Sequence, residues 1–71
     1  KISAPDYFLV YPNPTSDFLY FTQIKNIDIY DVLGKKLSSH MNTNIINVTQ
    51  LAQGIYILKT EDGQVIRFSK N

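Results

Sequence analysis

The stretch Leu51-Ala52-Gln53-Gly54-Ile55-Tyr56-Ile57-Leu58-Lys59-Thr60 contains the most apolar run of the chain. Its second half is rich in Ile, Tyr and Leu, which favours a β-strand, and a glycine bounds the run at its start. A continuous apolar strand of this kind usually lies mid-sheet and is buried on both faces or nearly so. We therefore expect Ile55–Thr60 to be a central strand of the fold.

Further segments rich in Tyr, Phe, Ile and Val surround this strand and give about seven short strands in all. No segment repeats a helical period convincingly, so the sequence predicts an all-β fold. In the third segment Ile27 and Ile29 alternate with polar residues and should form a buried face, with Asp28 in water. The other expected strands are Tyr7–Tyr11, Phe18–Phe21, Asn26–Asp31, Lys36–His40, Ile45–Val48 and Gln64–Ser69.

Turn residues separate these segments. Pro12-Asn13-Pro14 ends the first strand, because proline has no backbone N–H to donate to a ladder. Asp31 and Gly34 stand at the first and fourth places of a type I turn, and Asp62-Gly63 predicts a tight hairpin of the primed type. We expect a polar loop at residues 41–43, between the fourth and fifth segments.

Short strands with frequent turns are typical of a two-sheet antiparallel β-sandwich. Leu51, Gly54, Tyr56 and Leu58 are spaced like the corner of immunoglobulin-like domains, where a Tyr near the start of the penultimate strand hydrogen-bonds to upstream backbone. A cysteine follows that Tyr by two residues in those domains, and Leu58 stands at this place. We expect an immunoglobulin-like sandwich in which apolar packing replaces the inter-sheet disulfide.

Length, charge and cysteine content narrow the function. The chain has 71 residues, a formal net charge of +1 and no cysteine. This length allows one domain and leaves little room for a buried active site. The near balance of charge gives no field for nucleic acid or an anionic membrane surface, so we expect neither partner and no membrane insertion. Because Lys1 follows no initiator Met or signal peptide, we interpret residues 1–71 as one domain of a larger secreted protein.

The residue inventory offers little chemistry. His40 shares a strand face with Ser38, which fits a bare Ser–His dyad, but we predict an exposed, inert His on an edge strand beside a loop. Asp17 and Asp31 could meet at one end of a sandwich, yet they lack the dense ligand spacing of a calcium loop. The five Tyr residues leave a sugar-stacking platform open. We predict no enzyme, no metal and no cofactor.

Several landmarks follow one another in a distinctive order. They are Tyr11-Pro12-Asn13-Pro14 with Thr15-Ser16-Asp17 and Leu19; Ile27-Asp28-Ile29-Tyr30-Asp31-Val32-Leu33-Gly34-Lys35; Ile46-Asn47-Val48, Leu51 and Gly54-Ile55-Tyr56-Ile57-Leu58-Lys59; and Gly63 with Phe68-Ser69-Lys70. This order resembles that of the type A C-terminal sorting domains of the type IX (Por) secretion system, found in Bacteroidota.

The resemblance implies that the domain is an address label. The parent protein would reach the periplasm by its own signal peptide, and the outer-membrane translocon and its shuttle proteins would recognise the folded domain. A C-terminal signal peptidase or sortase commonly removes it, and the cargo is released or attached at the cell surface. The residues that would shape the label are Pro12, Asn13, Pro14, Asp31, Gly34, Gly54, Tyr56, Leu58 and Gly63.

The last strand is the candidate element for docking to the translocon. A terminal strand at a sheet edge can pair with a partner by β-augmentation, and the same edge allows a homodimer. The docking candidates are Ile66, Arg67, Phe68, Ser69 and Lys70. The alternative function is that of an immunoglobulin-like accessory module that binds carbohydrate or acts as a spacer, since such folds host many roles.

Overall fold

The computed structural model describes residues 8–71, so the expected strand residue Tyr7 lies outside the described part. Within residues 8–71 there is no helix, and hence none that could cross a membrane. The all-β prediction is confirmed. The strands of this part of the chain are β1 (Val10–Tyr11), β2 (Phe18–Asp31), β3 (Lys36–Asn47), β4 (Gly54–Thr60) and β5 (Val65–Lys70).

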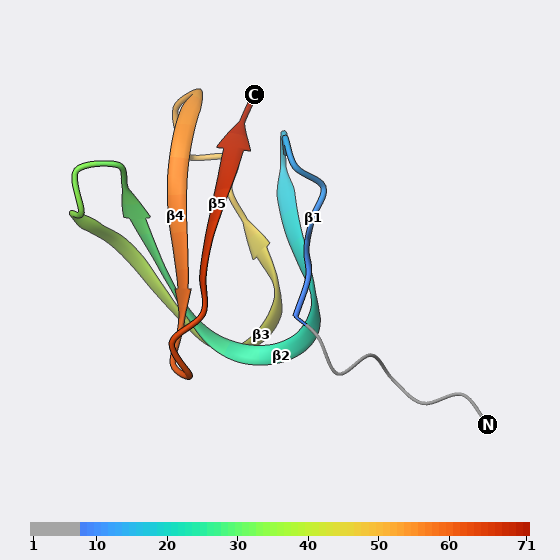
Figure 1. Ribbon diagram of the computed structural model, residues 1–71. Coiled ribbons are helices and arrows are strands. Elements are labelled where there is room, and N and C mark those ends of the chain that lie inside the picture. Colours follow the sequence, from blue (N-terminus) through green and yellow to red (C-terminus); the bar gives the residue numbers. More distant parts are fainter. Residues whose placement is uncertain (1–7) are drawn as a thin grey trace.

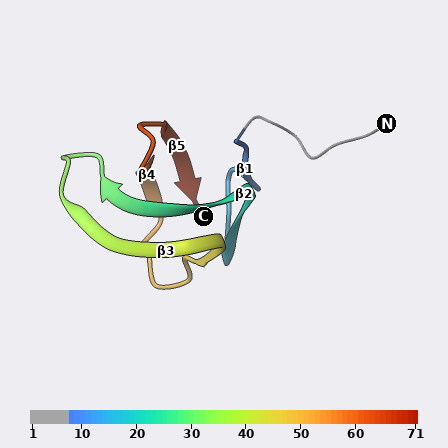
Figure 2. The ribbon, with the colours of Figure 1, turned by 90° about the horizontal axis from the view of Figure 1, so that it is seen from below.

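All these strands belong to one antiparallel sheet with β2 at its centre (Figure 1). One edge of β2 pairs with β3. The other edge pairs with β1 at residues 20–21 and with β4 at residues 27–31, and β5 follows beyond β4. Because β2 and β3 bend together, the sheet curls (Figure 2). The result is a curled open sheet.

The two-sheet sandwich of about seven short strands is not confirmed, because pairs of expected strands are continuous. Phe18–Phe21 and Asn26–Asp31 are both parts of β2, and the expected loop at residues 41–43 lies inside β3. Register shifts between β2 and β3, together with a positive φ of 49° at Asn42, absorb the bend while pairing continues on both sides of it. The polar residues there mark a bend rather than the end of a strand.

The two hairpin turns share one hydrogen-bond pattern, in which the amide of a glycine donates to the carbonyl three residues before it. The Gly34 amide donates to Asp31 O (3.1 Å) and the Gly63 amide donates to Thr60 O (3.1 Å). Both glycines have a positive φ, of 91° and 92°. The type I turn after Asp31 agrees with the prediction. The prediction of a primed turn at Asp62-Gly63 was wrong. Glu61 and Asp62 are the central residues of this turn, and a primed turn needs a positive φ at the first of them. In the described chain Asn42 is the one non-Gly residue with a positive φ.

The core lies inside the curl. Ile27, Ile29 and Leu58 are almost fully buried, as expected. The buried apolar side chains come from β2, β3, β4 and β5, and two more lie just outside the strands. The strand β4 is paired on both sides, but its residues alternate between buried and accessible. The expectation of burial on both faces was wrong, because the outer face of a single curled sheet meets solvent. The buried apolar residues are Phe8, Leu19, Phe21, Ile27, Ile29, Ile46, Val48, Leu58 and Phe68.

Candidate functional site

The proline motif lies against the last strand, far away in sequence. Both X-Pro peptide bonds of Tyr11-Pro12-Asn13-Pro14 are cis. The Asn13 side chain donates from Nδ2 to Arg67 O (3.2 Å), and its Oδ1 accepts from the Ser69 amide (2.9 Å). One side-chain amide thus makes the pair of hydrogen bonds that a neighbouring strand would make with its backbone.

Thr15 extends this contact along β5. Its amide donates to Ser69 O (2.9 Å), and its carbonyl accepts from the Asn71 amide (2.8 Å), which forms a parallel bridge. The Thr15 side chain is 1% exposed, and its hydroxyl donates to Phe18 O (2.5 Å). The segment between β1 and β2 therefore closes the outer edge of β5 from Arg67 to Asn71, and we call this contact the β5 closure.

The β5 closure bears directly on the docking candidates. Ile66 is half-buried, Phe68 is buried in the core, and Lys70 is 9% exposed with its Nζ donating to Asn71 O (3.0 Å). Arg67 and Ser69 direct backbone groups toward Asn13 and Thr15. A partner strand could pair with this stretch of edge only after displacing the residues of the β5 closure.

The corner residues lie as the sequence suggested. The Tyr56 hydroxyl donates to Ala52 O (2.7 Å), and its ring stacks on Phe68 with centroids 5.7 Å apart. Leu58 is fully buried. Gly54 begins β4, and its register partner is Lys70. The corner thus fixes the chain that leads into β4 and supports the inner side of β5.

Asp31 organises the turn between β2 and β3. Its Oδ1 accepts from the amides of Leu33 and Lys35, both at 2.9 Å. The amide of Asp31 donates to Lys35 O (3.0 Å), which closes the hairpin around Gly34. These contacts place Asp31 and Gly34 in the structural role of turn residues.

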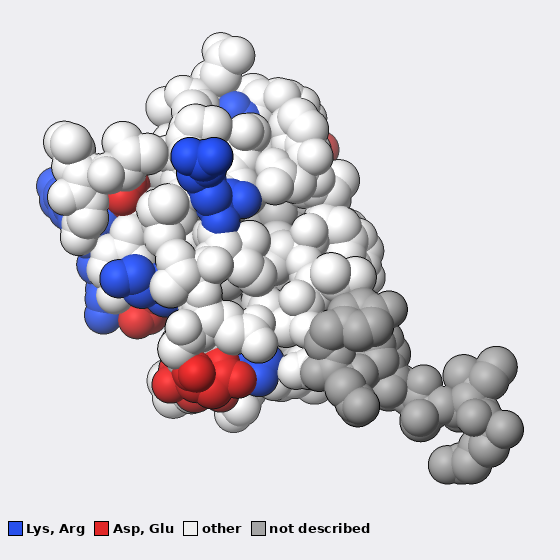
Figure 3. All heavy atoms as spheres, viewed as in Figure 1, with Lys and Arg blue, Asp and Glu red and all other residues white. Residues whose placement is uncertain are grey.

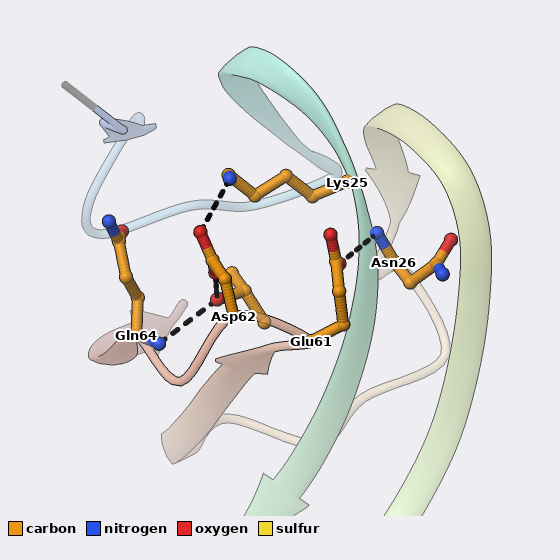
Figure 4. A network of polar contacts seen from close by, with 6 residues as sticks. Lys25, Asn26, Glu61, Asp62 and Gln64 are labelled. Atoms are coloured by element: carbon orange, nitrogen blue, oxygen red, sulfur yellow. Dashed lines mark hydrogen bonds and ion pairs between the residues drawn. The ribbon is translucent and has the colours of Figure 1, made fainter. Parts of the chain in front are cut away.

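A polar network joins the β4–β5 turn to the bend of β2 (Figure 4). Lys25 Nζ lies 2.8 Å from Asp62 Oδ2, and the Asn26 amide donates to Glu61 Oε1 (2.7 Å). The Thr60 hydroxyl donates to Asp62 and accepts from the Gln64 amide (3.0 Å). The hydrogen bond from Lys25, followed by that from Thr60, lowers the pKa of Asp62 below its ordinary value. Sequence reasoning missed this network because its members are far apart in the chain.

The possible dyad is present as a contact. Ser38 Oγ and His40 Nε2 are 2.9 Å apart, and His40 is half-buried rather than exposed as predicted, because its side chain points to the inner face. Asp28 lies on the other face, where its carboxylate accepts from Ser39 Oγ (2.7 Å) and approaches Lys36 Nζ (3.4 Å). The hydrogen bond from Ser39 is the largest cause of the lowered pKa of Asp28.

The acidic residues and the tyrosines are the candidate ligands for a metal ion and for a sugar. In residues 8–71 no three His, Asp or Glu side chains gather closely enough to hold a metal ion. The exposed rings of Tyr11 and Tyr20 stack on each other with centroids 5.9 Å apart. Each ring therefore covers part of the face that a sugar would need. Lys and Arg form separate patches on the face shown in Figure 3, with acidic groups beside some of them.

Comparison with known proteins gives one match. A family model described as a secretion system C-terminal sorting domain matches residues 9–70. No curated protein and no solved structure matches the chain. The matched range includes the whole proline motif, both turns, the Tyr56 corner and the last strand.

Proposed function

This chain belongs to the family of secretion system C-terminal sorting domains, and from this premise we propose that residues 1–71 act as one address label on a larger cargo protein. The domain is a C-terminal sorting signal for type IX secretion, which implies contact with that machinery and export to the cell surface or medium. The family is one of secretion signals rather than catalysts. We infer that this domain performs no catalysis and takes no cofactor, and that the Ser38–His40 contact is structural.

The observation that carries the proposal is the family match over residues 9–70. The β5 closure supports it, because the proline motif and the end of the last strand are the outermost landmarks of the family resemblance. Here they hydrogen-bond to each other. A label that is complete only when both ends of the domain are present would report that the whole domain has been made and folded.

The same interpretation gives the individual steps of the cargo's export. The cargo reaches the periplasm by its own signal peptide, and the outer-membrane translocon and shuttle proteins bind the folded domain. A C-terminal signal peptidase or sortase then removes it. Neither nucleic acid nor membrane insertion takes part. The Tyr56–Ala52 hydrogen bond supports a kinship with immunoglobulin-like sandwiches.

In this proposal the secretion machinery recognises the last strand while the β5 closure covers its edge. Ile66–Lys70 present an exposed Arg67 on the outer face, while Phe68 anchors the strand in the core. Because Asn13 and Thr15 occupy the edge, the machinery contacts the outward side chains of this strand rather than its backbone.

A reporter fusion tests the function. Residues 1–71 are fused to the C-terminus of a periplasm-directed fluorescent protein and expressed in a host with a working type IX system and in its translocon mutant. We expect the reporter at the surface or in the medium of the first host and in the periplasm of the second. Intact, folded fusion that stays periplasmic in both hosts would overturn the proposal.

A further inference from the structure

The outer face of the sheet carries a row of side chains that crosses four strands. Lys36 of β3 and Ile57 of β4 lie opposite Tyr30 of β2, on its two sides. Arg67 of β5 lies opposite Ile57, and Lys59 stands two residues after Ile57, so all these side chains share one face of the sheet. The buried neighbours that point inward from the same strands are Ile29, Leu58 and Phe68. We call the surface formed by Tyr30, Lys36, Ile57, Lys59 and Arg67 the Tyr30 face.

The Tyr30 ring contacts two ammonium groups. Lys59 Nζ lies 4.7 Å from the centroid of the ring, and Lys36 Nζ lies 6.0 Å from it. A cation over the face of an aromatic ring is attracted by the ring's quadrupole, and this attraction does not neutralise the charge of the cation. The ring therefore keeps two positive charges from different strands close together on the solvent side of the sheet.

The positive charge of the Tyr30 face is not balanced. Lys36, Lys59 and Arg67 are exposed. Asp28 is the one carboxylate that the described strands place on this face, and it already approaches Lys36 Nζ (3.4 Å). Glu61, beyond the end of β4, accepts from a backbone amide of β2. Within residues 8–71 neither Lys59 nor Arg67 has an ion pair, so both can bind an anion from outside the domain.

Apolar side chains lie among these cations. Ile57 is half-buried within the row, and Val65, opposite Lys59, is 60% exposed. Ile55 continues the same face of β4 and is 42% exposed. A polyanion whose groups are all polar, such as a phosphorylated polysaccharide, would contact the cations and leave these apolar side chains in water. A peptide that carries both carboxylates and apolar side chains gains from both kinds of contact.

We propose that the Tyr30 face binds an acidic segment of the secretion machinery. Carboxylates of that segment pair with Lys59 and Arg67, and its apolar side chains pack on Ile57 and Val65. The inference rests on the proposed function and states the chemistry of the partner, which the family match does not give. It needs no free strand edge, so it agrees with the β5 closure.

Charge also selects this partner over a second copy of the domain. If two copies met through the Tyr30 face, the exposed cations of each copy would face those of the other, with Asp28 of each copy to offset them. Like charges that are brought together at an interface cost free energy. An acidic segment instead neutralises the cations that have no partner within the described chain.

The test uses the reporter fusion with charge reversals inside and outside the Tyr30 face. Arg67→Glu reverses a charge whose side chain has no hydrogen bond or ion pair within residues 8–71. Lys35→Glu is its matched control, because it changes the net charge equally at an exposed residue of the turn after Asp31. Arg67→Lys keeps the charge, and Val65→Thr removes apolar surface without altering charge. Thermal melts of the purified domains establish that each variant folds.

We expect Arg67→Glu to lower the secreted reporter by about tenfold or more, because an attractive contact becomes a repulsive one. Val65→Thr should lower it by about threefold, and Lys35→Glu and Arg67→Lys should be secreted like wild type. If wild type is secreted and folded Arg67→Glu is secreted equally well, or if Lys35→Glu lowers secretion as much, the inference is overturned while the proposed function stands. If the wild-type fusion is not secreted, both fail. Should Arg67→Glu not fold, Arg67→Gln decides, with a smaller loss expected.

Purified domain, dextran sulfate and vesicles of phosphatidylcholine with phosphatidylglycerol address the other occupants. We expect the wild-type domain to bind neither probe at physiological ionic strength and to sediment as a monomer at micromolar concentration. Binding to either probe that Arg67→Glu abolishes, with Val65→Thr secreted like wild type, would show that the face binds a polar polyanion and would overturn the inference. A wild-type dimer that Arg67→Glu converts to monomer would assign the face to a second copy and would equally overturn it.

Discussion

At the scale of single residues, Asn13 does with its side chain what a strand does with its backbone. Its amide supplies one donor and one acceptor, and both are used on β5. The flanking prolines cannot donate backbone hydrogen bonds, so a side chain must do so at this place. Asn is well suited because aspartate offers no donor and a serine hydroxyl is shorter.

Replacing Asn13 tests this role. We expect Asn13→Ala to lower the free energy of unfolding by about 1–2 kcal/mol, since both hydrogen bonds are lost at a solvent-accessible site. Asn13→Asp keeps the acceptor for the Ser69 amide and loses the donor to Arg67 O, so its loss should be smaller. Urea denaturation of the isolated domain measures both values. Equal stability of the wild type and Asn13→Ala would contradict the role.

Tyr56 contributes through both its ring and its hydroxyl. We expect Tyr56→Phe to cost about 1 kcal/mol, because it removes only the hydrogen bond to Ala52 O. Tyr56→Ala also removes the stack on Phe68 and should cost about 3 kcal/mol, which is close to the whole stability of so small a domain. Thermal melts should show a lowered transition for the first variant and none for the second. A wild-type melt for Tyr56→Ala would refute this.

At the scale of elements, the hairpin turns depend on their glycines. At Gly63 the φ of 92° strains any side chain with a Cβ, although no atom lies within 4 Å of the place that the Cβ would take. We expect Gly63→Ala to destabilise the domain by about 1–2 kcal/mol, and Gly63→Asn, which tolerates positive φ better, by less. Chemical denaturation compares the two. If both variants match wild type, backbone strain does not matter at this turn.

The sequence could predict contacts between residues that are close in the chain, but not contacts between distant residues. The turn at Asp31–Gly34 and the Tyr56 corner were predictable because their contacts are local, with Tyr56 bonding only four residues upstream. The β5 closure was not, because Asn13 and Ser69 are 56 residues apart and nothing in the local pattern links them. The continuity of β2 was missed because polar residues near Lys25 resemble a loop, while the bend there is absorbed by register shifts.

The docking hypothesis shows the same limit. The last strand was expected to have an open edge. In the strand order alone this holds, because β5 has β4 as its one neighbour among the described strands. The structure places Asn13 and Thr15 on that edge, whereas β3 of the described chain pairs with β2 alone. Edge strands can be counted from a sequence, but whether another segment covers an edge depends on tertiary contacts.

At the scale of the whole molecule, Lys25 and Asp62 connect the bend of the sheet to the β4–β5 turn. The pKa of Asp62 is lowered in the fold, so its contribution to stability is fully present above its ordinary value of 3.8. That contribution is lost as the pH falls through the lower folded value. We expect Asp62→Asn to flatten the fall in unfolding free energy between about pH 5 and about pH 2.

Urea titrations of wild type and Asp62→Asn at several pH values measure that difference. Asp62 is exposed and screened by solvent, so the change should be modest and should shrink with added salt. Identical slopes for the two proteins would show that the Lys25 contact does not stabilise the fold.

The end of the chain decides whether the curl is closed. Deleting residues 69–71 removes every backbone partner of Thr15 on β5 and uncovers its buried side chain. We expect this deletion to lower the melting temperature sharply and to abolish secretion of the reporter, because the proposed label is complete only when the β5 closure has formed. Deleting Asn71 alone removes one hydrogen bond to Thr15 and should reduce secretion only slightly. A folded 69–71 deletion that is secreted like wild type would show that the machinery does not require the β5 closure.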